Sequence, residues 1–383
     1  MGVKKGNTLI NKYSKEISLE TLRGNIVIVD LFYILHKFIR LDILNPLYYI
    51  LEVINLIEKF KYYGIKPIFV IDGRPPLEKT KKLQRLREKS TVKLTELLIS
   101  NDIDTNTNTN TNTNTNTKKA DSLLKKSLCV TPKHIHECED LFNRLDCLYI
   151  HVKNCEGDTV IAELASLLQK DVTILENVYV YSADFDMFLY CDIKYILKEL
   201  DFENDTFKLY IKKYILNHLN ITNEELVLSG FLSGTSLNCG LYKATMESSI
   251  ELNKCYGPFK SLNDFLSVLP IINNNREENQ KILIPSYNFT DRYELVINTY
   301  SLINTNTFSR KSIIKFINEK VKIIKEAKNK NTLSNFFNVK YVLEYIQSIT
   351  QESYLIQKYR EKIREYSKNH FGFYIILENE YDC

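Results

Sequence analysis

Residues 178–190 read VYVYSADFDMFLY, and this stretch decides the fold because an apolar strand runs directly into two aspartates. Asp184 and Asp186 stand two residues apart, where Gly or Asn would turn the chain without bringing like charges together. A short, uninterrupted apolar run is typical of a strand that is buried on both faces of a parallel sheet. The two acids that follow it therefore call for an explanation beyond the turn itself.

Two earlier apolar runs end in the same way. Residues 26–30 read IVIVD and end in Asp30, and residues 67–72 read PIFVID and end in Asp72. The residues between these runs carry apolar side chains at helical spacing. A strand, a helix and a strand in this order predict a right-handed parallel unit whose strand ends share one edge of the sheet.

Further along the chain the alternation continues, which predicts an α/β protein with a central, mostly parallel sheet flanked by helices. A strand is expected at 147–152 and a helix near 158–169. Beyond about residue 222 the pattern becomes mostly helical. We therefore expect an α/β core over 1–222, a second unit over 223–270 and a mostly helical C-terminal extension over 271–383.

Composition narrows the class of protein. The 383 residues are 44% hydrophobic and 26% charged, which is ordinary for a globular chain. The net charge of +4 is too small to indicate a binding partner by itself. No run approaches the roughly eighteen apolar residues of a membrane span. The eight cysteines include no CxxC pair, which suits reduced thiols inside a cell. The Asn/Thr tract at 104–117 can bury nothing, so we expect a disordered insertion there.

Six acids are predicted to meet at the carboxyl edge of the sheet, where open parallel sheets bind their ligands. They are Asp30, Asp72, Glu156, Asp158, Asp184 and Asp186. One Asp at a strand end is usually a turn former or a helix cap, but six carboxylates together would repel strongly without a multivalent cation. Oxygen ligands favour Mg²⁺ or Mn²⁺, and two such ions about 4 Å apart can hold the attacking and leaving oxygens of a phosphodiester.

Basic residues follow Asp72 directly. Residues 74–89 carry seven basic and two acidic side chains. A helix that begins near Pro76 would carry Lys79, Lys82 and Arg85 along one face beside the acids, where cations can hold phosphate. The alternative interpretation is a charged helix exposed to solvent.

The segment KHIHECED at 133–140 places two histidines two residues apart, which puts them on different sides of a helix. No second cysteine pair accompanies it, so we do not expect a zinc site there.

These motifs resemble the flap endonuclease (XPG-type) family of 5′ nucleases. The segments MGVKKGNTLI, IVIVD, PIFVIDGRPP, VTPKHIHECEDLF, NCEGDTVIAEL and YSADFDMFL occur in the family's order over about residues 1–245. LSGTSLNCGLYKAT and FKSLNDFL resemble the poxvirus branch in particular. The resemblance implies a PIN-like 5′-nuclease fold with a helical arch over about 73–130 and a helix–hairpin–helix DNA clamp over 223–270.

The same resemblance implies roles for single residues. The six acids would hold two Mg²⁺ or Mn²⁺ ions. Catalytic roles fall on Gly2, whose amino group is exposed after Met removal, and on the phosphate-gripping Lys79 and Arg85. Contacts with DNA fall on Lys82, Gly240 and Lys243.

Two departures from the family's pattern concern the metal site and the DNA clamp. Ser236 occupies the position of a seventh acid, and of the paired glycines in the clamp turn only Gly240 is evident. Residues 330–337, KNTLSNFF, fit the family's sliding-clamp peptide except that Lys330 replaces its Gln. The alternative for this segment is a helix or loop end anchored by its apolar side chains.

We therefore expect a divalent-metal-dependent, structure-specific 5′ nuclease that hydrolyses phosphodiesters of branched, flapped or nicked DNA in replication, repair or recombination. One alternative is a 5′–3′ exoribonuclease of the same architecture. The other is a branched-DNA-binding scaffold with weakened catalysis, which Ser236 and the thin clamp turn suggest. We expect a monomer that touches no membrane and works inside the cell, in the host cytoplasm if the poxvirus likeness holds.

Overall fold

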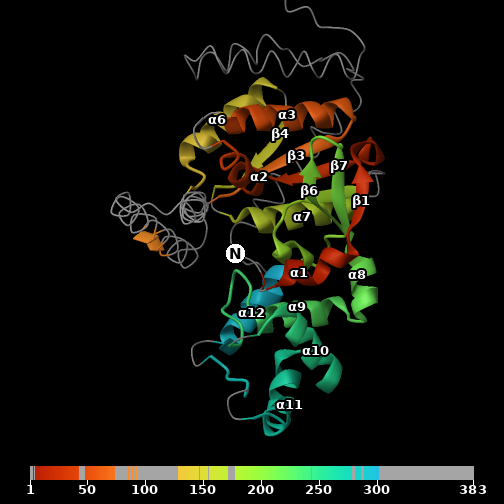
Figure 1. Cartoon of the computed structure of the whole chain (residues 1–383), viewed down its shortest axis with the longest axis vertical. Helices are drawn as coiled ribbons and strands as arrows, with labels where there is room; N and C mark the ends of the chain where they lie inside the picture. Colours follow the sequence, from red (N-terminus) through yellow and green to blue (C-terminus); the bar gives the residue numbers. More distant parts are fainter. Residues whose placement is uncertain are drawn as a thin grey trace, which may run out of the picture.

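A seven-stranded sheet forms the centre of the molecule, in the order β1-β7-β6-β5-β2-β3-β4 (Figure 1). The computed structural model describes residues 3, 5–42, 48–73, 85, 88–89, 92–93, 128–145, 147–153, 155–170, 177–242, 244–277, 281–285 and 289–301. The strands in chain order are β1 (Lys15–Ser18), β2 (Ile26–Asp30), β3 (Lys66–Ile71), β4 (Leu148–His151), β5 (Val178–Tyr181), β6 (Tyr195–Asp201) and β7 (Thr206–Ile211).

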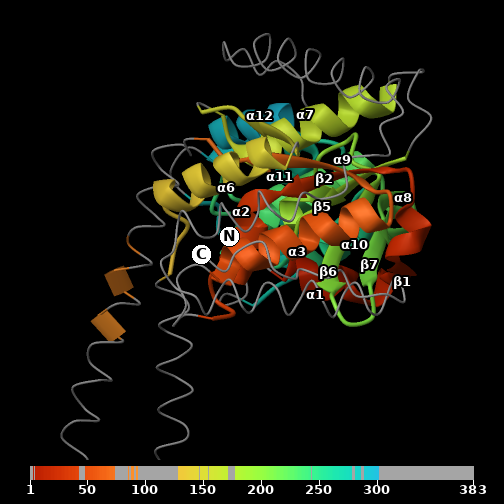
Figure 2. The same ribbon diagram turned by 90° about the horizontal axis from the view of Figure 1, so that it is seen from above.

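The middle of this sheet is parallel, as predicted, and one edge is antiparallel. β2 pairs in parallel with both β3 and β5, while β7 runs antiparallel to β6 and to β1. Figure 2 shows β2 and β5 next to one another at the centre. The chain passes from β2 to β3 on one side and returns later to β5 on the other. The order of strands therefore reverses between β2 and β5, and open parallel sheets bind ligands at such a reversal.

Helices cover both faces of the sheet. In chain order they are α1 (Gly6–Ile10), α2 (Leu31–Phe38), α3 (Tyr48–Tyr62), α6 (Pro132–Arg144), α7 (Gly157–Lys170), α8 (Lys212–Leu219), α9 (Asn223–Ser233), α10 (Met246–Tyr256), α11 (Leu262–Asn274) and α12 (Phe289–Tyr300). The 3₁₀ turns are η1 (Asn11–Tyr13), η2 (Leu19–Leu22) and η3 (Phe185–Phe188). α2, α3 and α6 share one hydrophobic core, and α7 and the later helices share the other.

The side chains of β2 explain its uninterrupted apolar sequence. Ile26 and Ile28 belong to the core beneath α7, while Val27 and Val29 belong to the core beneath α2, α3 and α6. All four are buried, because a strand alternates its side chains between two covered faces. Only Asp30, at the end of the strand, is partly exposed.

α6 begins with a capping box. Thr131 N donates to His134 Nδ1 (3.0 Å), and the Thr131 hydroxyl accepts from the backbone of His134. Burial lowers the pKa of His134, which suits the neutral ring that accepts this bond. His134 thus satisfies the first turn of a helix, which accounts for it without a metal.

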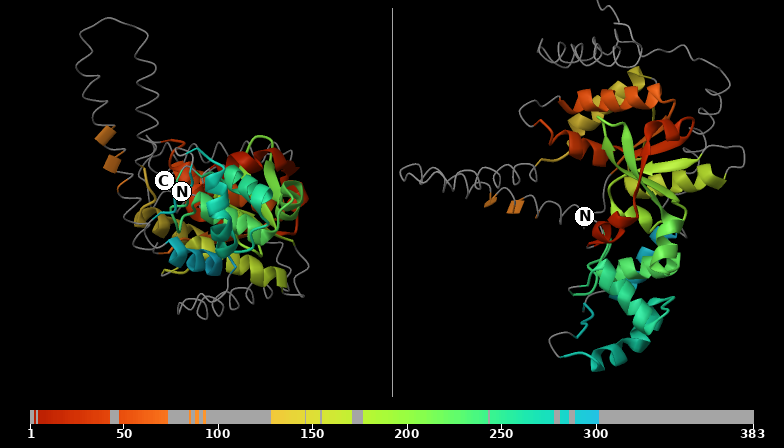
Figure 3. Two further views of the ribbon diagram at one scale, coloured as in Figure 1. Left: turned by 90° about the horizontal axis from the view of Figure 1, so that it is seen from below. Right: turned by 45° about the vertical axis from the view of Figure 1, so that its right-hand side comes forward.

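The helices that follow β7 form a lobe beyond the sheet, as the green and cyan segments of Figure 3 show from two further sides. α11 runs across residue 270, where we placed the start of the C-terminal extension. α12 belongs to that predicted extension but packs back on α9, since the ring of Phe231 lies 4.6 Å from Phe289 and 5.2 Å from Tyr293. No helix in the described ranges is long and apolar enough to cross a membrane.

Three predicted features lie outside the described residues. They are the Asn/Thr tract at 104–117, the clamp peptide at 330–337, and the predicted arch apart from residues 73, 85, 88–89, 92–93 and 128–130.

Candidate active site

Asp30 stands at the carboxyl end of β2, where the strand order reverses. Its Oδ1 accepts from the backbone N–H of Tyr33 (3.0 Å) and so caps α2. Its Oδ2 accepts from the Ser182 hydroxyl (2.7 Å), which follows the neighbouring strand β5. The carboxylate is therefore a helix cap and a bridge between two strand ends at once.

Asp72 follows β3 and is tied to the start of α7. Its Oδ1 accepts from Gly157 N (2.6 Å), at the helix end where the backbone dipole favours negative charge. A Cβ on residue 157 would lie 1.8 Å from that oxygen, so any other residue there would force the Asp72 carboxylate to move. The backbone of Gly73 also donates to Cys155 O (3.0 Å). These contacts bring the acid after β3 against the segment that holds Glu156 and Asp158.

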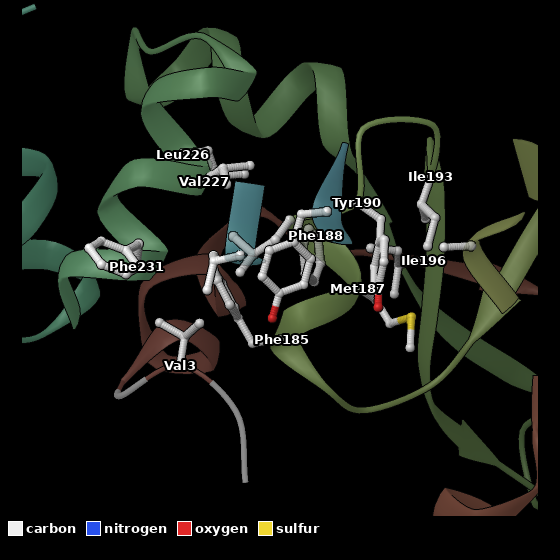
Figure 4. Close-up of a cluster of buried hydrophobic side chains, with 14 of the residues drawn as sticks. Val3, Phe185, Met187, Phe188, Tyr190, Ile193, Ile196, Leu226, Val227 and Phe231 are labelled. Carbon is white, nitrogen blue, oxygen red and sulfur yellow. The ribbon is translucent and has the colours of Figure 1, made fainter. Parts of the chain in front are cut away.

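Asp184 and Asp186 open the 3₁₀ turn η3 after β5. Asp184 Oδ1 accepts from Asp186 N (3.1 Å), and the Ser182 hydroxyl accepts from Asp184 N (3.2 Å). Ser182 thus links Asp30 to Asp184 through one hydroxyl. Below the turn, Phe185 packs in the core that also contains Val3 and Phe231 (Figure 4).

Asp186 is fully buried and engages distant segments. Its Oδ1 accepts from Val3 N (3.2 Å), and its Oδ2 accepts from Ser236 N (3.2 Å) and the Tyr300 hydroxyl (2.9 Å). Burial and the neighbouring Asp184 raise the pKa of Asp186 to about 6, although the bonds from Ser236 and Tyr300 lower it.

Tyr190 lies between the acids that follow β4 and those that follow β5. Its buried hydroxyl lies 3.4 Å from the Thr159 hydroxyl, in the first turn of α7. Burial raises the pKa of this phenol well above its usual value, and the charges of Asp158, Glu156 and Asp186 raise it further. Acids from the ends of both β4 and β5 therefore lie close enough to Tyr190 to shift its pKa.

Lys198 is a buried cation beside Asp184. It is 4% exposed, and its Nζ donates to Asn7 Oδ1 (2.6 Å) and to Ala183 O (3.0 Å). Burial lowers its pKa to about 8, while the charges of Asp184 and Glu199 act in the opposite direction. Lys198 thus fixes the backbone that precedes Asp184 against α1.

The donor chemistry of this edge fits a hard divalent cation. Every predicted ligand offers carboxylate oxygens, which suits Mg²⁺ or Mn²⁺ better than zinc. Within the described ranges, however, no three His, Cys, Asp or Glu side chains surround a common point as a finished ligand set. The bonds of Asp30 and Asp72 turn their oxygens toward the protein, but each oxygen has two lone pairs and can hold an ion as well.

The structure places the other predicted residues less completely. Arg85 is described and exposed, and Gly240 is buried in the turn before α10 with φ +64°. Val3, next to Gly2, reaches Asp186, but Gly2 itself lies outside the described residues. So do Lys79, Lys82 and Lys243.

Comparison with known proteins agrees with this arrangement. The XPG N-terminal domain model matches residues 1–93. Flap endonuclease 1 of Picrophilus torridus is 27% identical over 312 residues, covering 71% of this chain and 79% of that protein. The Nanoarchaeum equitans protein of the same name is 26% identical over 279 residues, covering 65% and 74%. The N-terminal quarter of this chain is thus similar to the XPG N-terminal domain, and about two thirds of it is similar to flap endonucleases.

Solved structures share the fold of this chain. The catalytic core of Rad2 superposes with a TM-score of 0.54 at 19% identity, covering 79% of this chain and 86% of that one. The Holliday junction-resolving enzyme GEN1, in complex with product DNA, Mg²⁺ and Mn²⁺ ions, gives a TM-score of 0.57 at 15% identity, covering 91% and 72%. The predicted PIN-like 5′-nuclease fold is thereby confirmed, while the poxvirus branch stays a prediction.

Sequence reasoning missed three members of the site, namely Ser182, Tyr190 and Tyr300. Ser182 precedes the quoted acids, and its small hydroxyl gave no signal of its bond to Asp30. Tyr190 and Tyr300 look like ordinary core aromatics in the sequence, and their rings do pack together at 5.0 Å. Only the fold shows that the hydroxyl of Tyr300 reaches an acid 114 residues earlier in the chain.

Proposed function

We propose that this chain is a divalent-metal-dependent, structure-specific 5′ nuclease that acts on branched DNA. One observation carries the proposal: acids follow the ends of four neighbouring parallel strands of a flap endonuclease fold, and hydrogen bonds join Asp30 to the turn of Asp184 and Asp72 to the start of α7. The Rad2 core in complex with a DNA substrate and GEN1 in complex with product DNA support DNA as the substrate class.

The residues that would hold a divalent cation are Asp30, Asp72, Glu156 and Asp158, with Asp184 beside them. When bound, such a cation would neutralise the charge of a scissile phosphate and of the attacking oxygen. The chain's own contribution is to keep the acids in place. Ser182 joins Asp30 to the Asp184 turn, and Gly157 N joins Asp72 to α7.

Basic side chains beside the acids would bind the phosphates of the DNA backbone. Arg85 is exposed in the segment that follows Asp72, which is compatible with the phosphate-gripping role we propose for it together with Lys79. Free thiols agree with an intracellular setting, since the cysteines in the described ranges form no disulfide.

The proposal is tested by cleavage of end-labelled flap, nicked, gapped and Holliday-type DNA in Mg²⁺, with a matched flap whose single strand is RNA. We expect the wild type to cut a branched DNA, EDTA to stop it, and Asp72→Ala and Asp184→Ala each to slow it by at least about 100-fold. Glu16→Ala, on the exposed edge strand β1, is the matched acidic control and should cut at the wild-type rate.

Three outcomes would contradict the proposal. Cleavage by Asp72→Ala at the wild-type rate would show that the acids take no part in the reaction. Tight binding of branched DNA without any cleavage in Mg²⁺ or Mn²⁺ would favour the scaffold. Preferential cleavage of the RNA flap would favour the exoribonuclease, because the 2′-hydroxyl is the group that distinguishes the two substrates.

A further inference from the structure

Asp186 differs from the other acids of the site because its carboxylate is buried and accepts hydrogen bonds from three separate segments of the chain. It is 1% exposed and accepts from Val3 N, Ser236 N and the Tyr300 hydroxyl. A carboxylate offers about four lone-pair positions, two on each oxygen. Ser236 N and the Tyr300 hydroxyl take both positions on Oδ2, and Val3 N takes one on Oδ1. A cation could reach only the position left on Oδ1, and the residue is buried.

The donors come from parts of the chain that the fold holds firmly. Val3 packs in the core beside Phe185, which Figure 4 shows in close-up. Tyr300 ends α12, where its ring packs on Tyr190 at 5.0 Å and its carbonyl accepts from Cys191 N (3.1 Å). A cation that took the place of these donors would have to separate the N-terminus and α12 from the turn at η3.

Ser236 is a second indication that Asp186 does not hold a cation. It stands where the resemblance expects a seventh acid, and its backbone N–H donates to Asp186. A carboxylate in that position would repel Asp186 and would need a cation between the two. The serine instead satisfies Asp186 directly.

We propose that Asp186 is a structural anchor and not a metal ligand, so that the DNA-free protein binds one divalent ion, among Asp30, Asp72, Glu156 and Asp158. This inference rests on the proposed function, since it concerns the metal site of the same nuclease. Asp186 joins the N-terminus, the turn at Ser236 and α12 to the strand end. The Asp184 side of the site is left with a single carboxylate.

The primary measurement is the stoichiometry of Mn²⁺ on the wild-type full chain without DNA, by equilibrium dialysis and metal analysis. One ion per chain is expected, and Asp72→Asn should abolish it or weaken it at least about tenfold. Two ions per chain, one of them lost in Asp186→Asn, would overturn the inference but leave the nuclease intact. No Mn²⁺ binding in the wild type would instead overturn the proposed function.

Two variants separate anchoring from metal binding. Asp186→Asn should keep one Mn²⁺ with a Kd within about twofold of the wild type, and it should melt at a lower temperature. Tyr300→Phe keeps the ring packing and removes one donor, so we expect a fall of about 3–6 °C in Tm with unchanged Mn²⁺ stoichiometry. A second Mn²⁺ gained in Tyr300→Phe, or an unchanged Tm in both variants, would show that Asp186 is not held as we infer.

Discussion

Gly157→Ala is the sharpest perturbation that the site offers. A methyl group on residue 157 would lie 1.8 Å from Asp72 Oδ1 and 2.9 Å from its Cγ, which is far inside van der Waals contact. Asp72 must therefore turn away and lose its 2.6 Å bond from Gly157 N. The substitution adds one carbon to α7 and displaces a predicted metal ligand on another element.

The expected size follows from the contacts that change. A hydrogen bond to a charged acceptor contributes about 1.5–3 kcal/mol to the free energy of unfolding. Replacing Gly by Ala in a helix stabilises the helix by up to about 1 kcal/mol, which offsets part of that loss. The net loss is about 1–2 kcal/mol, or roughly 3–6 °C in Tm for a domain of this size. Displacing a carboxylate ligand should also weaken Mn²⁺ binding by about 10- to 100-fold.

The Asp72→Ala background provides the matched control. There the carboxylate is gone, so Gly157→Ala meets no clash and should raise Tm slightly through its helix propensity. Differential scanning calorimetry on the four proteins of this cycle measures the coupling, which we expect to be about 2–3 kcal/mol. Additive effects, or an unchanged Tm and Mn²⁺ affinity in Gly157→Ala alone, would refute the contact between α7 and Asp72.

Three further predictions concern the surroundings of the site. Burial lowers the pKa of Lys212 to about 8, so the folded chain loses this proton before the unfolded chain does. The free energy of unfolding should therefore rise between about pH 8 and 10.5, and Lys212→Met should remove up to about 3 kcal/mol of that rise in urea titrations at pH 7.5 and 10. Lys198→Met should slow flap cleavage about tenfold with only a small change in circular dichroism, since it frees the backbone before Asp184. Thr131→Ala should cost about 1 kcal/mol in urea unfolding through the lost cap of α6, while Thr290→Ala, exposed on α12, should cost less than half as much.

The sequence predicted the parts of the fold that depend on local pattern. The apolar runs before Asp30, Asp72 and Asp184 are legible because their strands are buried on both faces. The start of α6 is a local pattern of the same kind, since the cap Thr131 is followed by Pro132, which suits the first turn. The parallel order then followed from the alternation of strands with helices.

Other parts depend on contacts that no local pattern records. β1 buries only Ile17 of its four residues, so it lacks the apolar alternation that predicts an edge strand. Gly157 is visible in the sequence, but its close approach to Asp72 exists only after β3 and α7 meet. The return of α12 to the site depends on ring packing between Phe231 and Phe289, which lie far apart in the chain. Tertiary packing decided these features.

We infer that acids from separate strand ends hold one divalent ion between them. Fe²⁺ in place of Mg²⁺, with hydrogen peroxide and ascorbate, generates radicals at the bound ion and cuts the polypeptide beside it, and mass spectrometry locates the cuts. We expect cuts near residues 30, 72, 156–158 and 184, all suppressed by excess Mg²⁺. Cuts confined to one of these segments, or spread over the surface and indifferent to Mg²⁺, would contradict it.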